Sequence, residues 1–404
     1  MGRLPSVKAF LFIFITFFIV LPPLLVHTQY SLYFSQSSSD VTDSGLKQRN
    51  SDRIKLSEKQ LKGELQRIRN ASSLQNKRGS SRADVVVTVV TMDRSRLVAD
   101  DFQPKYLTQV ALRLLELKRN FEQLSLTERL ESRTTFELRI CNVDRHVEVF
   151  YEAKNLTPVF QQFVRFPAFQ SQTTSIIHEH ILEREKQDYV FCLNQSLHLK
   201  PSHVLLVEDD ALPLDNLFPV VDHVIRKREQ LMYSQSQRVS FFKLFHPYRL
   251  RSYVVPDVPL LLELLGASLV FGSIAFQIHR YLDSSETVLN RHWLAWIVYF
   301  LFICIVIGHP NVIQFRTFLS PYLYAVRPAP SCCTQALLIP SEEAKNIVEY
   351  MSQHRCYKGY AKDSMLEHYL TSASTLGRYV EPNLFQHIGQ LSAVRSKYLD
   401  SIIV

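Results

Sequence analysis

Short apolar runs recur along the chain from residue 83 onward, and segments with helical periodicity separate them. A strand that is covered on both faces loses the strict alternation of apolar and polar residues, so such runs predict buried strands. The predicted strands are 84–90, 135–143, 204–207, 241–245 and 336–339. The predicted helices are 106–126, 181–197, 341–353 and 364–370. Strands that alternate with helices in this order predict an α/β fold with a mainly parallel sheet.

An uncharged run at 9–26 follows Arg3 and Lys8 and is rich in Phe, Ile and Leu. Its length is at the lower end for a membrane span and also overlaps that of a signal-peptide core. Because no small-x-small cleavage motif follows, we favour a retained signal anchor at 9–27 over a cleaved signal. The positively charged tail, 1–8, then stays in the cytosol.

The segment 28–82 is rich in Ser, Gln, Lys and Arg and has few aromatic residues after Phe34. A weak helical periodicity runs through it, at Leu56, Leu61 and Leu65 among others. We predict a partly helical luminal stalk here rather than a domain.

Two further apolar runs, 258–278 and 293–307, interrupt the α/β pattern. Trp293 and Trp296 at one end of the second run are typical of a membrane interface. We therefore favour a pair of transmembrane helices over a pair of core helices, with the second helix extended by the residues that follow it.

The predicted transmembrane hairpin occupies 258–313 and divides one domain into two parts. Two spans return the chain to the side from which it started, so 83–257 and 314–404 share one compartment. The charges of the loop between the two runs balance, so they give no independent indication of orientation.

The chain has 404 residues, of which 46% are hydrophobic and 21% are charged, so it can bury a sizeable core. Much of its net charge of +8 lies in flanking segments that do not interleave with aromatic residues. Nucleic acid is therefore a poor candidate partner, and an anionic membrane surface or an anionic donor fits better. N-glycosylation sequons begin at Asn70, Asn155 and Asn194, which agrees with a luminal location.

The cysteines show no CxxC or zinc-like spacing, so a structural zinc site has little support. Cys141 and Cys192 lie in the same predicted domain and could form a disulfide in an oxidising compartment. The adjacent residues Cys332 and Cys333 could form a vicinal disulfide, or each could pair elsewhere. The sequence does not decide between these two arrangements.

Three consecutive carboxylates, Glu208, Asp209 and Asp210, directly follow the apolar run 204–207. Three acids at one point are costly unless a cation neutralises them. A hard divalent ion, held by carboxylates and by substrate phosphates, fits this arrangement. The end of a strand in an open α/β sheet is also where ligands bind. A solvated acidic turn after a core strand is the alternative.

The sequence contains no GxSxG elbow, no Walker lysine loop and no GxGxxG turn. The residues that could carry chemistry are the acids, His387 near the C-terminus and a polar strand end, Thr91-Met-Asp-Arg94, where a nucleotide could bind. These groups suffice for sugar transfer from a nucleotide donor, with a cation on the leaving diphosphate and a carboxylate as the base.

Several motifs together give the chain a family resemblance. They are Thr-Met-Asp-Arg94, Val-Glu-Asp-Asp-Ala-Leu-Pro213, Cys-Cys-Thr334, Gly-Tyr-Ala-Lys-Asp363 and Asn-Leu-Phe-Gln-His-Ile-Gly389, with a membrane hairpin inside the domain. This combination resembles the post-GPI-attachment-to-proteins factor 4 family of Golgi N-acetylgalactosamine (GalNAc) transferases, which act on GPI-anchor glycans. The resemblance covers nearly all of the chain beyond the stalk, and it rests on the combination rather than on any single motif.

The resemblance implies an inverting GT-A glycosyltransferase that is split by two spans and embedded in the Golgi membrane, with its catalytic domain in the lumen. It further implies UDP-GalNAc as donor, GPI-anchored proteins as acceptors, and manganese dependence. Glu208, Asp210 and His387 are the implied metal ligands, although Glu stands in the first position of the acidic motif, where the family pattern has Asp. Asp363 is the implied general base. The implied substrate-binding residues are Thr91, Met92, Asp93, Arg94, Asp209, Thr334, Gln335 and Lys362.

Without the resemblance, His387 is more simply a structural histidine, and Asp363 is an acid that stabilises the first turn of a helix. Two other functions stay open. One is an N-glycan-type N-acetylglucosaminyltransferase, whose soluble acceptors do not need a membrane hairpin. The other is a non-catalytic, membrane-bound glycan-binding protein, against which the intact acids argue.

Overall fold

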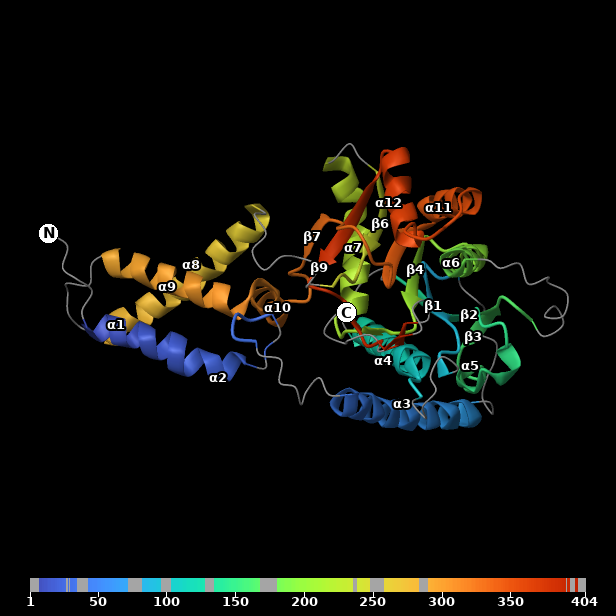
Figure 1. Cartoon of the computed structure of the whole chain (residues 1–404), viewed down its shortest axis with the longest axis horizontal. Helices are drawn as coiled ribbons and strands as arrows, with labels where there is room; N and C mark the ends of the chain where they lie inside the picture. The colour runs from blue at the N-terminus through green and yellow to red at the C-terminus, as the bar shows by residue number, and fades with distance from the viewer. Residues whose placement is uncertain are drawn as a thin grey trace. The chain divides into compact units, whose positions relative to one another are not determined.

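The computed structural model describes residues 7–26, 28, 30–34, 43–71, 82–95, 103–127, 134–167, 180–234, 238–247, 258–282, 290–389, 391–392 and 397–398. The chain divides into two compact units, one formed by 1–42 and 247–323 and the other by 43–246 and 324–404 (Figure 1). The smaller unit thus consists of the N-terminal segment and of an insertion in the larger unit.

An eight-stranded sheet organises the larger unit, in the order β3-β2-β1-β4-β8-β6-β9-β7. The strands β1, β2, β3 and β4 are parallel, as are β6 and β9, whereas β8 and β7 run antiparallel to their neighbours. The α/β class predicted from the sequence is confirmed, and a large, mostly parallel sheet fits a GT-A-like domain. The strands are β1 Val85–Thr91, β2 Phe136–Asn142, β3 Gln161–Val164, β4 His203–Glu208, β6 Val239–Lys243, β7 Ala325–Pro328, β8 Ala336–Pro340 and β9 Leu376–Glu381.

Helices cover both faces of this sheet (Figure 1). One face packs against α4 (Tyr106–Thr127), α5 (Tyr151–Leu156) and α7 (Leu217–Ser234). The other packs against α6 (Ile181–His198), α11 (Ser341–Gln353) and α12 (Lys362–Ser372). Successive side chains of a strand point to opposite faces. Accordingly, Leu205 and Val207 of β4 lie in the first core, and Val204 and Leu206 lie in the second.

A second, two-stranded sheet lies next to the acidic end of β4. It pairs β5 (Ala211–Pro213) with β10 (Phe385–His387) in antiparallel register, so that His387 faces Ala211. This small sheet connects the C-terminal part of the domain to the turn that follows β4. The remaining short pair joins β11 (Leu391–Ser392) to β12 (Lys397–Tyr398).

The predicted stalk contains a continuous helix, α3 (Asp43–Ala71), which belongs to the larger unit and packs along α4 (Figure 1). Polar contacts hold it there: Nε of Arg53 lies 2.8 Å from Oε1 of Gln109, and Arg119 forms an ion pair with Glu64. Leu61, one of the periodic leucines of this segment, also packs against the core of the larger unit.

Six segments with helical structure make up the smaller unit, within the residues that the structure describes. They are α1 (Val7–Phe14), a π-helical stretch at Ile15–Val20, α2 (Leu21–Leu25), α8 (Val258–Leu282), α9 (Asn290–Ile307) and α10 (His309–Leu319). The helices α8 and α9 lie side by side, and Gly272 allows their close approach, since a Cβ there would lie 2.8 Å from Cα of Ile297.

Among the described helices, α8 alone is long and apolar enough to cross a bilayer unbroken, over Leu260–Leu282. The segment His292–Ile307 meets His309–Arg316 at an angle of 106°, so this pair is either one broken span or a re-entrant loop. The break is at Gly308, whose φ of 90° suits glycine. The apolar helix Phe10–Leu25 is shorter than a full span. The predicted two-helix transmembrane hairpin is therefore not confirmed, and α8 is a candidate for one of its two helices.

Candidate active site

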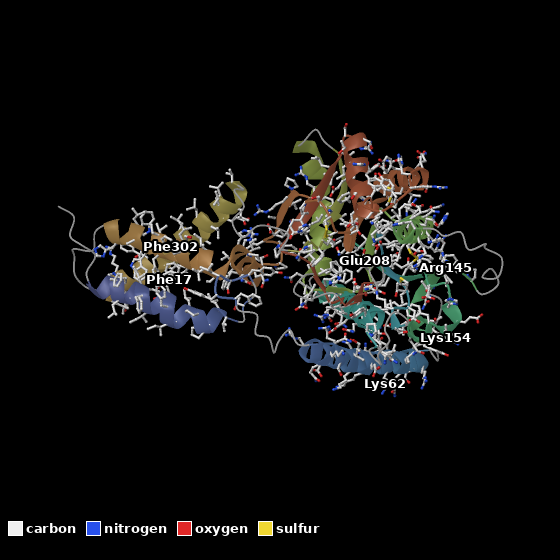
Figure 2. The ribbon with its side chains drawn as sticks, viewed as in Figure 1. Phe17, Lys62, Arg145, Lys154, Glu208 and Phe302 are labelled. Carbon is white, nitrogen blue, oxygen red and sulfur yellow. A yellow bond between two sulfur atoms is a disulfide. The ribbon has the colours of Figure 1, made fainter. Side chains whose placement is uncertain are left out.

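The end of β1 brings Thr91 and Arg94 onto the acidic turn after β4. Because β1 pairs with β4 in parallel, both strands end at the same edge of the sheet. Oγ1 of Thr91 donates a 2.7 Å hydrogen bond to Oδ2 of Asp209. The guanidinium of Arg94 forms ion pairs with Asp209 and with Oδ2 of Asp210, the latter at 2.6 Å. Figure 2 shows the neighbouring Glu208 inside the larger unit.

The small sheet brings His387 to the same turn. Its Nε2 lies 3.4 Å from Oδ2 of Asp210, and the N–H of Ile388 donates a 2.8 Å hydrogen bond to the carbonyl oxygen of Asp210. Gly389 completes this close packing, since a Cβ there would lie 2.4 Å from Oδ2 of Asp210. The other carboxylate oxygen of Asp210, Oδ1, is buried and has no hydrogen-bond partner in the described part of the chain.

The three acids differ in their electrostatic surroundings. Burial raises the pKa of Asp209 to about 6, although Arg94 opposes the shift. Burial also acts against ionisation of Asp210, but Arg94 and His387 outweigh it and hold its pKa well below the ordinary value. Burial raises the pKa of Glu208, with Lys362 opposing. Asp210 is therefore the acid that is held most firmly as a carboxylate.

Asp363, at the start of α12, connects to the acidic end of β4 through Thr334. Oγ1 of Thr334 donates to Oδ1 of Asp363 at 3.1 Å and lies 3.3 Å from Oε1 of Glu208. The N–H of Cys333 donates to Oδ2 of Asp363 at 3.0 Å. The preceding residue, Lys362, places Nζ 2.9 Å from Oε1 of Glu208 and 2.7 Å from Oε1 of Glu185.

A cavity of about 100 Å³ opens beside these groups. Among the predicted site residues, Thr91, Met92, Arg94, Glu208, Asp209 and Lys362 line it. The rest of the lining comes from Val90, Val143 and one face of α6, with Ile181, Arg184, Glu185, Asp188 and Tyr189. Burial raises the pKa of Asp188 to about 6, although Arg165 opposes the shift.

The lining residues of α6 were not predicted from the sequence. Their spacing, at positions 181, 184, 185, 188 and 189, repeats as one face of a helix does. Most of them are polar, and all but Tyr189 are partly exposed. A search for polar residues at helical spacing would have found this face.

Three predicted substrate-binding residues, Asp93, Thr334 and Gln335, do not line the cavity. Oδ1 of Asp93 accepts hydrogen bonds from the N–H and the hydroxyl of Ser95, so this side chain closes its own turn. Gln335 contributes its carbonyl oxygen to the N–H of Glu208, at 2.8 Å, and its buried Oε1 has no partner among the described residues. The donor contacts predicted for Asp93, Thr334 and Gln335 stay predictions.

No group of three or more His, Cys, Asp or Glu side chains is arranged to hold a metal ion by itself in the described part of the chain. The chemistry of a cation site is nevertheless present, since Asp210 and His387 lie together and Oδ1 of Asp210 is available. Oε1 of Glu208, by contrast, already accepts a hydrogen bond from Nζ of Lys362, and the role of Glu208 as a metal ligand stays a prediction. The residues fit an ion that takes two protein ligands and completes its coordination with phosphate oxygens and water.

The model of one protein family, GPI-N-acetylgalactosamine transferase PGAP4, matches residues 85–386. The chain belongs to this family. The matched range begins at the first residue of β1, includes α8, α9 and α10, and ends one residue before His387. As a member of the GPI-N-acetylgalactosamine transferase family, the chain is a glycosyltransferase that acts on GPI.

Two disulfides lie within the range matched by the PGAP4 family model. Cys141 of β2 is bonded to Cys192 of α6, and both residues are fully buried. Cys332 is bonded to its neighbour Cys333 in the segment that precedes β8. Of the two arrangements that the sequence left open for this pair, the structure has the vicinal disulfide.

The three sequon asparagines, Asn70, Asn155 and Asn194, all have exposed side chains. They are therefore accessible to a glycosylating enzyme if this part of the chain is in the lumen.

Proposed function

We propose that this chain is a divalent-cation-dependent, inverting transferase that moves GalNAc from UDP-GalNAc to the core mannose of GPI anchors in the Golgi. The observation that carries the proposal is the convergence of three elements at one strand end. Asp210 follows β4, His387 ends β10 and Asp363 begins α12, and Thr334 links Asp363 to Glu208 at that end.

We place part of the donor nucleotide in the cavity beside β1 and α6, whose volume of about 100 Å³ is too small for the whole donor. Parallel strands that end at one edge of a sheet form the usual nucleotide site of an α/β fold. Arg94 and Lys362 would offer positive charge to the diphosphate there, and Arg184 and Tyr189 of α6 also line the cavity. The ring of Tyr189 also faces Lys362, whose Nζ lies 5.5 Å from its centroid.

Asp363 is the proposed general base. Hydrogen bonds from Thr334 and from the N–H of Cys333 engage one lone pair on each of its carboxylate oxygens and leave others for an acceptor hydroxyl. The acceptor oxygen forms its bond to C1 of GalNAc as the bond from C1 to the UDP phosphate breaks. The bonding pair leaves with UDP, and the hydroxyl proton passes to Asp363. Attack from the face opposite to the leaving group inverts the configuration at C1.

Asp210 and His387 are the residues that would hold a manganese ion. An ion bound there neutralises negative charge on the leaving diphosphate. Arg94 contacts the same carboxylate, so it compensates part of the charge of Asp210 before any ion or donor binds.

A membrane location suits a lipid-linked acceptor. The helices α8, α9 and α10 interrupt the catalytic unit between β6 and β7, and α8 could cross a bilayer. A domain tethered at the membrane meets acceptors confined to that membrane at a raised effective concentration. We therefore propose a multi-pass protein of the Golgi membrane with its catalytic unit in the lumen.

Mass spectrometry of GPI glycans tests the reaction. Cells that lack this protein should lose the GalNAc branch, and the wild-type chain should restore it. Asp210→Ala should fail to restore the branch, whereas Asp215→Ala, which changes an acid with an 80% exposed side chain, should succeed. Equal restoration by Asp210→Ala would remove the proposed role of Asp210, and a GalNAc branch that does not depend on the protein would remove the proposed acceptor.

A glycosylation tag tests the topology. A sequon inserted between α8 and α9 should stay unglycosylated, because the proposed orientation places that connection in the cytosol. A sequon inserted in the exposed turn at 357–359 should be glycosylated. Glycosylation between α8 and α9 would overturn the proposed orientation.

A further inference from the structure

The segment that carries the vicinal disulfide has an unusual backbone. Cys332 and Cys333 have φ angles of 77° and 75°, which place both residues in the left-handed region. Side chains with a Cβ disfavour this region, and residues other than glycine visit it singly rather than in succession. Something must therefore hold these two residues there, and the bond between their sulfur atoms is the covalent constraint at that position.

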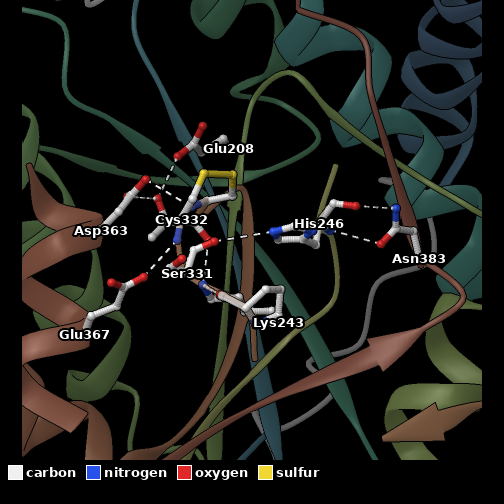
Figure 3. Close-up of a disulfide and its surroundings, with 11 residues drawn as sticks. Glu208, Lys243, His246, Ser331, Cys332, Asp363, Glu367 and Asn383 are labelled. Carbon is white, nitrogen blue, oxygen red and sulfur yellow. Dashed lines mark hydrogen bonds between the residues drawn. A yellow bond between two sulfur atoms is a disulfide. The ribbon is translucent and has the colours of Figure 1, made fainter. Parts of the chain in front are cut away.

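This backbone conformation directs two consecutive N–H groups at helix α12. The N–H of Cys332 donates to Oε1 of Glu367 at 2.9 Å, and the N–H of Cys333 donates to Oδ2 of Asp363 at 3.0 Å (Figure 3). Asp363 and Glu367 are four residues apart, so they lie one above the other on the same helix face. Consecutive backbone N–H groups that point the same way form a concavity suited to anions.

The carbonyl groups of the same segment are held from the other side. Nζ of the buried Lys243, at the end of β6, donates to the carbonyl oxygens of Pro330 at 2.7 Å and Cys332 at 2.5 Å (Figure 3). The segment is therefore fixed between β6 and α12. Thr334, the next residue after the disulfide, reaches both Asp363 and Glu208 through Oγ1.

The disulfide contributes little by closing a loop. A disulfide that stabilises a fold through chain entropy does so by joining distant residues, and the stabilisation grows with the length of the loop. Cys141 and Cys192 are separated by 51 positions, whereas Cys332 and Cys333 are separated by 1. The effect of the vicinal bond is therefore local: it restricts the conformation of the two residues that it joins.

We propose that the Cys332–Cys333 disulfide is a positioning element for sugar transfer. It keeps two consecutive N–H groups aimed at Glu367 and Asp363, and so fixes the carboxylate of Asp363 against Thr334 and the acidic end of β4. This inference rests on the proposed role of Asp363 as general base. Reduction of the bond would release the two residues to the ordinary right-handed regions, turn their N–H groups away from α12 and loosen Asp363.

The test compares three double variants of the full-length protein in detergent micelles. Cys332→Ala/Cys333→Ala removes the bond and leaves residues that disfavour positive φ. Cys332→Gly/Cys333→Gly also removes the bond, but glycine adopts positive φ readily. Cys141→Ala/Cys192→Ala is the matched control for the loss of a disulfide elsewhere in the same unit. Mass spectrometry of the unreduced, alkylated protein first establishes the vicinal bond, and free thiols at both positions would overturn the proposal.

The first readout is kinetic. The Ala/Ala variant at 332 and 333 should lose at least about tenfold in kcat, with the donor KM within about twofold and the unfolding temperature near that of wild type. The Gly/Gly variant should recover part of the lost kcat, which a role in overall folding would not produce. A wild-type kcat in Ala/Ala, or a fall in unfolding temperature with no difference between Gly/Gly and Ala/Ala, would overturn the inference.

The second readout does not depend on activity. Hydrogen exchange at the amides of Cys332 and Cys333 should be slow in wild type, and the amides of residues 332 and 333 should exchange faster in Ala/Ala. An unchanged rate there would overturn the inference even if kcat falls. Asp363→Asn, assayed in parallel, tests the role of Asp363 as general base separately from the positioning role of the disulfide. If Asp363→Asn transfers GalNAc at the wild-type rate, both the role of Asp363 as general base and the positioning role of the disulfide are wrong, while the GalNAc transferase activity of the family is unaffected. If it is inactive and Ala/Ala is fully active, only the positioning role falls.

Discussion

His387 approaches Asp210 with its Nε2 at 3.4 Å from Oδ2, although the two residues belong to the two parts of the catalytic unit that the insertion separates. The contact follows from the antiparallel pairing of β10 with β5, in which His387 faces the residue after Asp210. The hydrogen bond from Ile388 to the backbone of Asp210 fixes the same register. One short pair of strands thus decides where both side chains of the proposed cation site lie.

Replacement of either side chain should weaken cation binding. Asp210→Asn keeps the shape of the side chain and removes its charge, and His387→Ala removes the ring nitrogen. We expect each to lower the affinity for Mn²⁺ by at least about 10-fold to 100-fold, as measured by titration calorimetry, and to lower GalNAc transfer in parallel. Chelation of divalent ions should abolish transfer by wild type. Asp215→Asn is the matched control, and wild-type Mn²⁺ affinity in Asp210→Asn would contradict the assignment.

Gly389 should be intolerant of any side chain. A Cβ at this position would lie 2.4 Å from Oδ2 of Asp210 and 2.8 Å from Cε1 of His387, so one of these groups must move. We expect Gly389→Ala to reduce kcat by about 10-fold or more, because misplacement by about 1 Å can cost ~100-fold. Gly63→Ala is the control, since nothing lies within 4 Å of its Cβ and alanine favours the helix. Equal kcat in both variants would show that the site adapts to the methyl group.

The sequence predicted the strands whose apolar runs are buried on both faces. The central strands β1, β4 and β8 lie within one residue of their predicted bounds, because each contributes side chains to both cores. It did not predict the short pair β5 and β10, whose few residues have no periodicity of their own. It also did not predict β9, because Gly377 and Arg378 interrupt the apolar run of that strand.

The sequence by itself indicated the candidate site where chemistry is concentrated in a motif, and the family resemblance implied the remaining residues. The acidic triplet shows in the sequence because three carboxylates in a row require neutralisation. The family resemblance implied Arg94 and Lys362 as substrate-binding residues, but the sequence did not indicate their ion pairs with Asp210 and Glu208. Lys243 is a similar case, since the sequence shows a lysine at the end of an apolar strand but not the two carbonyl groups that it binds.

Loss of the long-range disulfide should affect stability more than chemistry. Cys141 and Cys192 are 51 positions apart, and the entropy of closing such a loop corresponds to about 4 kcal/mol. We expect Cys141→Ala/Cys192→Ala to lower the free energy of unfolding by roughly that amount in chemical denaturation. Well below its unfolding temperature the variant should retain kcat within a few-fold, because neither sulfur contacts the acidic turn. A large loss of kcat without a loss of stability would contradict this division of roles between the two disulfides.

The buried Lys243 should make stability depend on pH in the alkaline range. Burial lowers its pKa from 10.5 to about 8, although Asp363 and Glu367 oppose the shift. Between these two values the unfolded chain binds more protons than the folded chain, so the free energy of unfolding rises with pH across this window. Below pH 8 the cost of burying the charged amine is present in full, and it disappears as the pH approaches 10.5. The total is on the order of 3 kcal/mol.

Lys243→Met removes this titration together with the two hydrogen bonds to backbone carbonyls, so the comparison must be made as a function of pH. Chemical unfolding in micelles at pH 7, 8, 9 and 10 should show the stability of wild type relative to Lys243→Met increasing by about 2 kcal/mol between pH 8 and pH 10. Lys345→Met, which removes an exposed lysine of α11, serves as the matched variant. If the free energy of unfolding differs between wild type and Lys243→Met by the same amount at pH 8 and at pH 10, folding does not favour the neutral amine. In that case Lys243 would hold the carbonyl groups of Pro330 and Cys332 as a charged ammonium throughout, with Asp363 and Glu367 compensating for its burial.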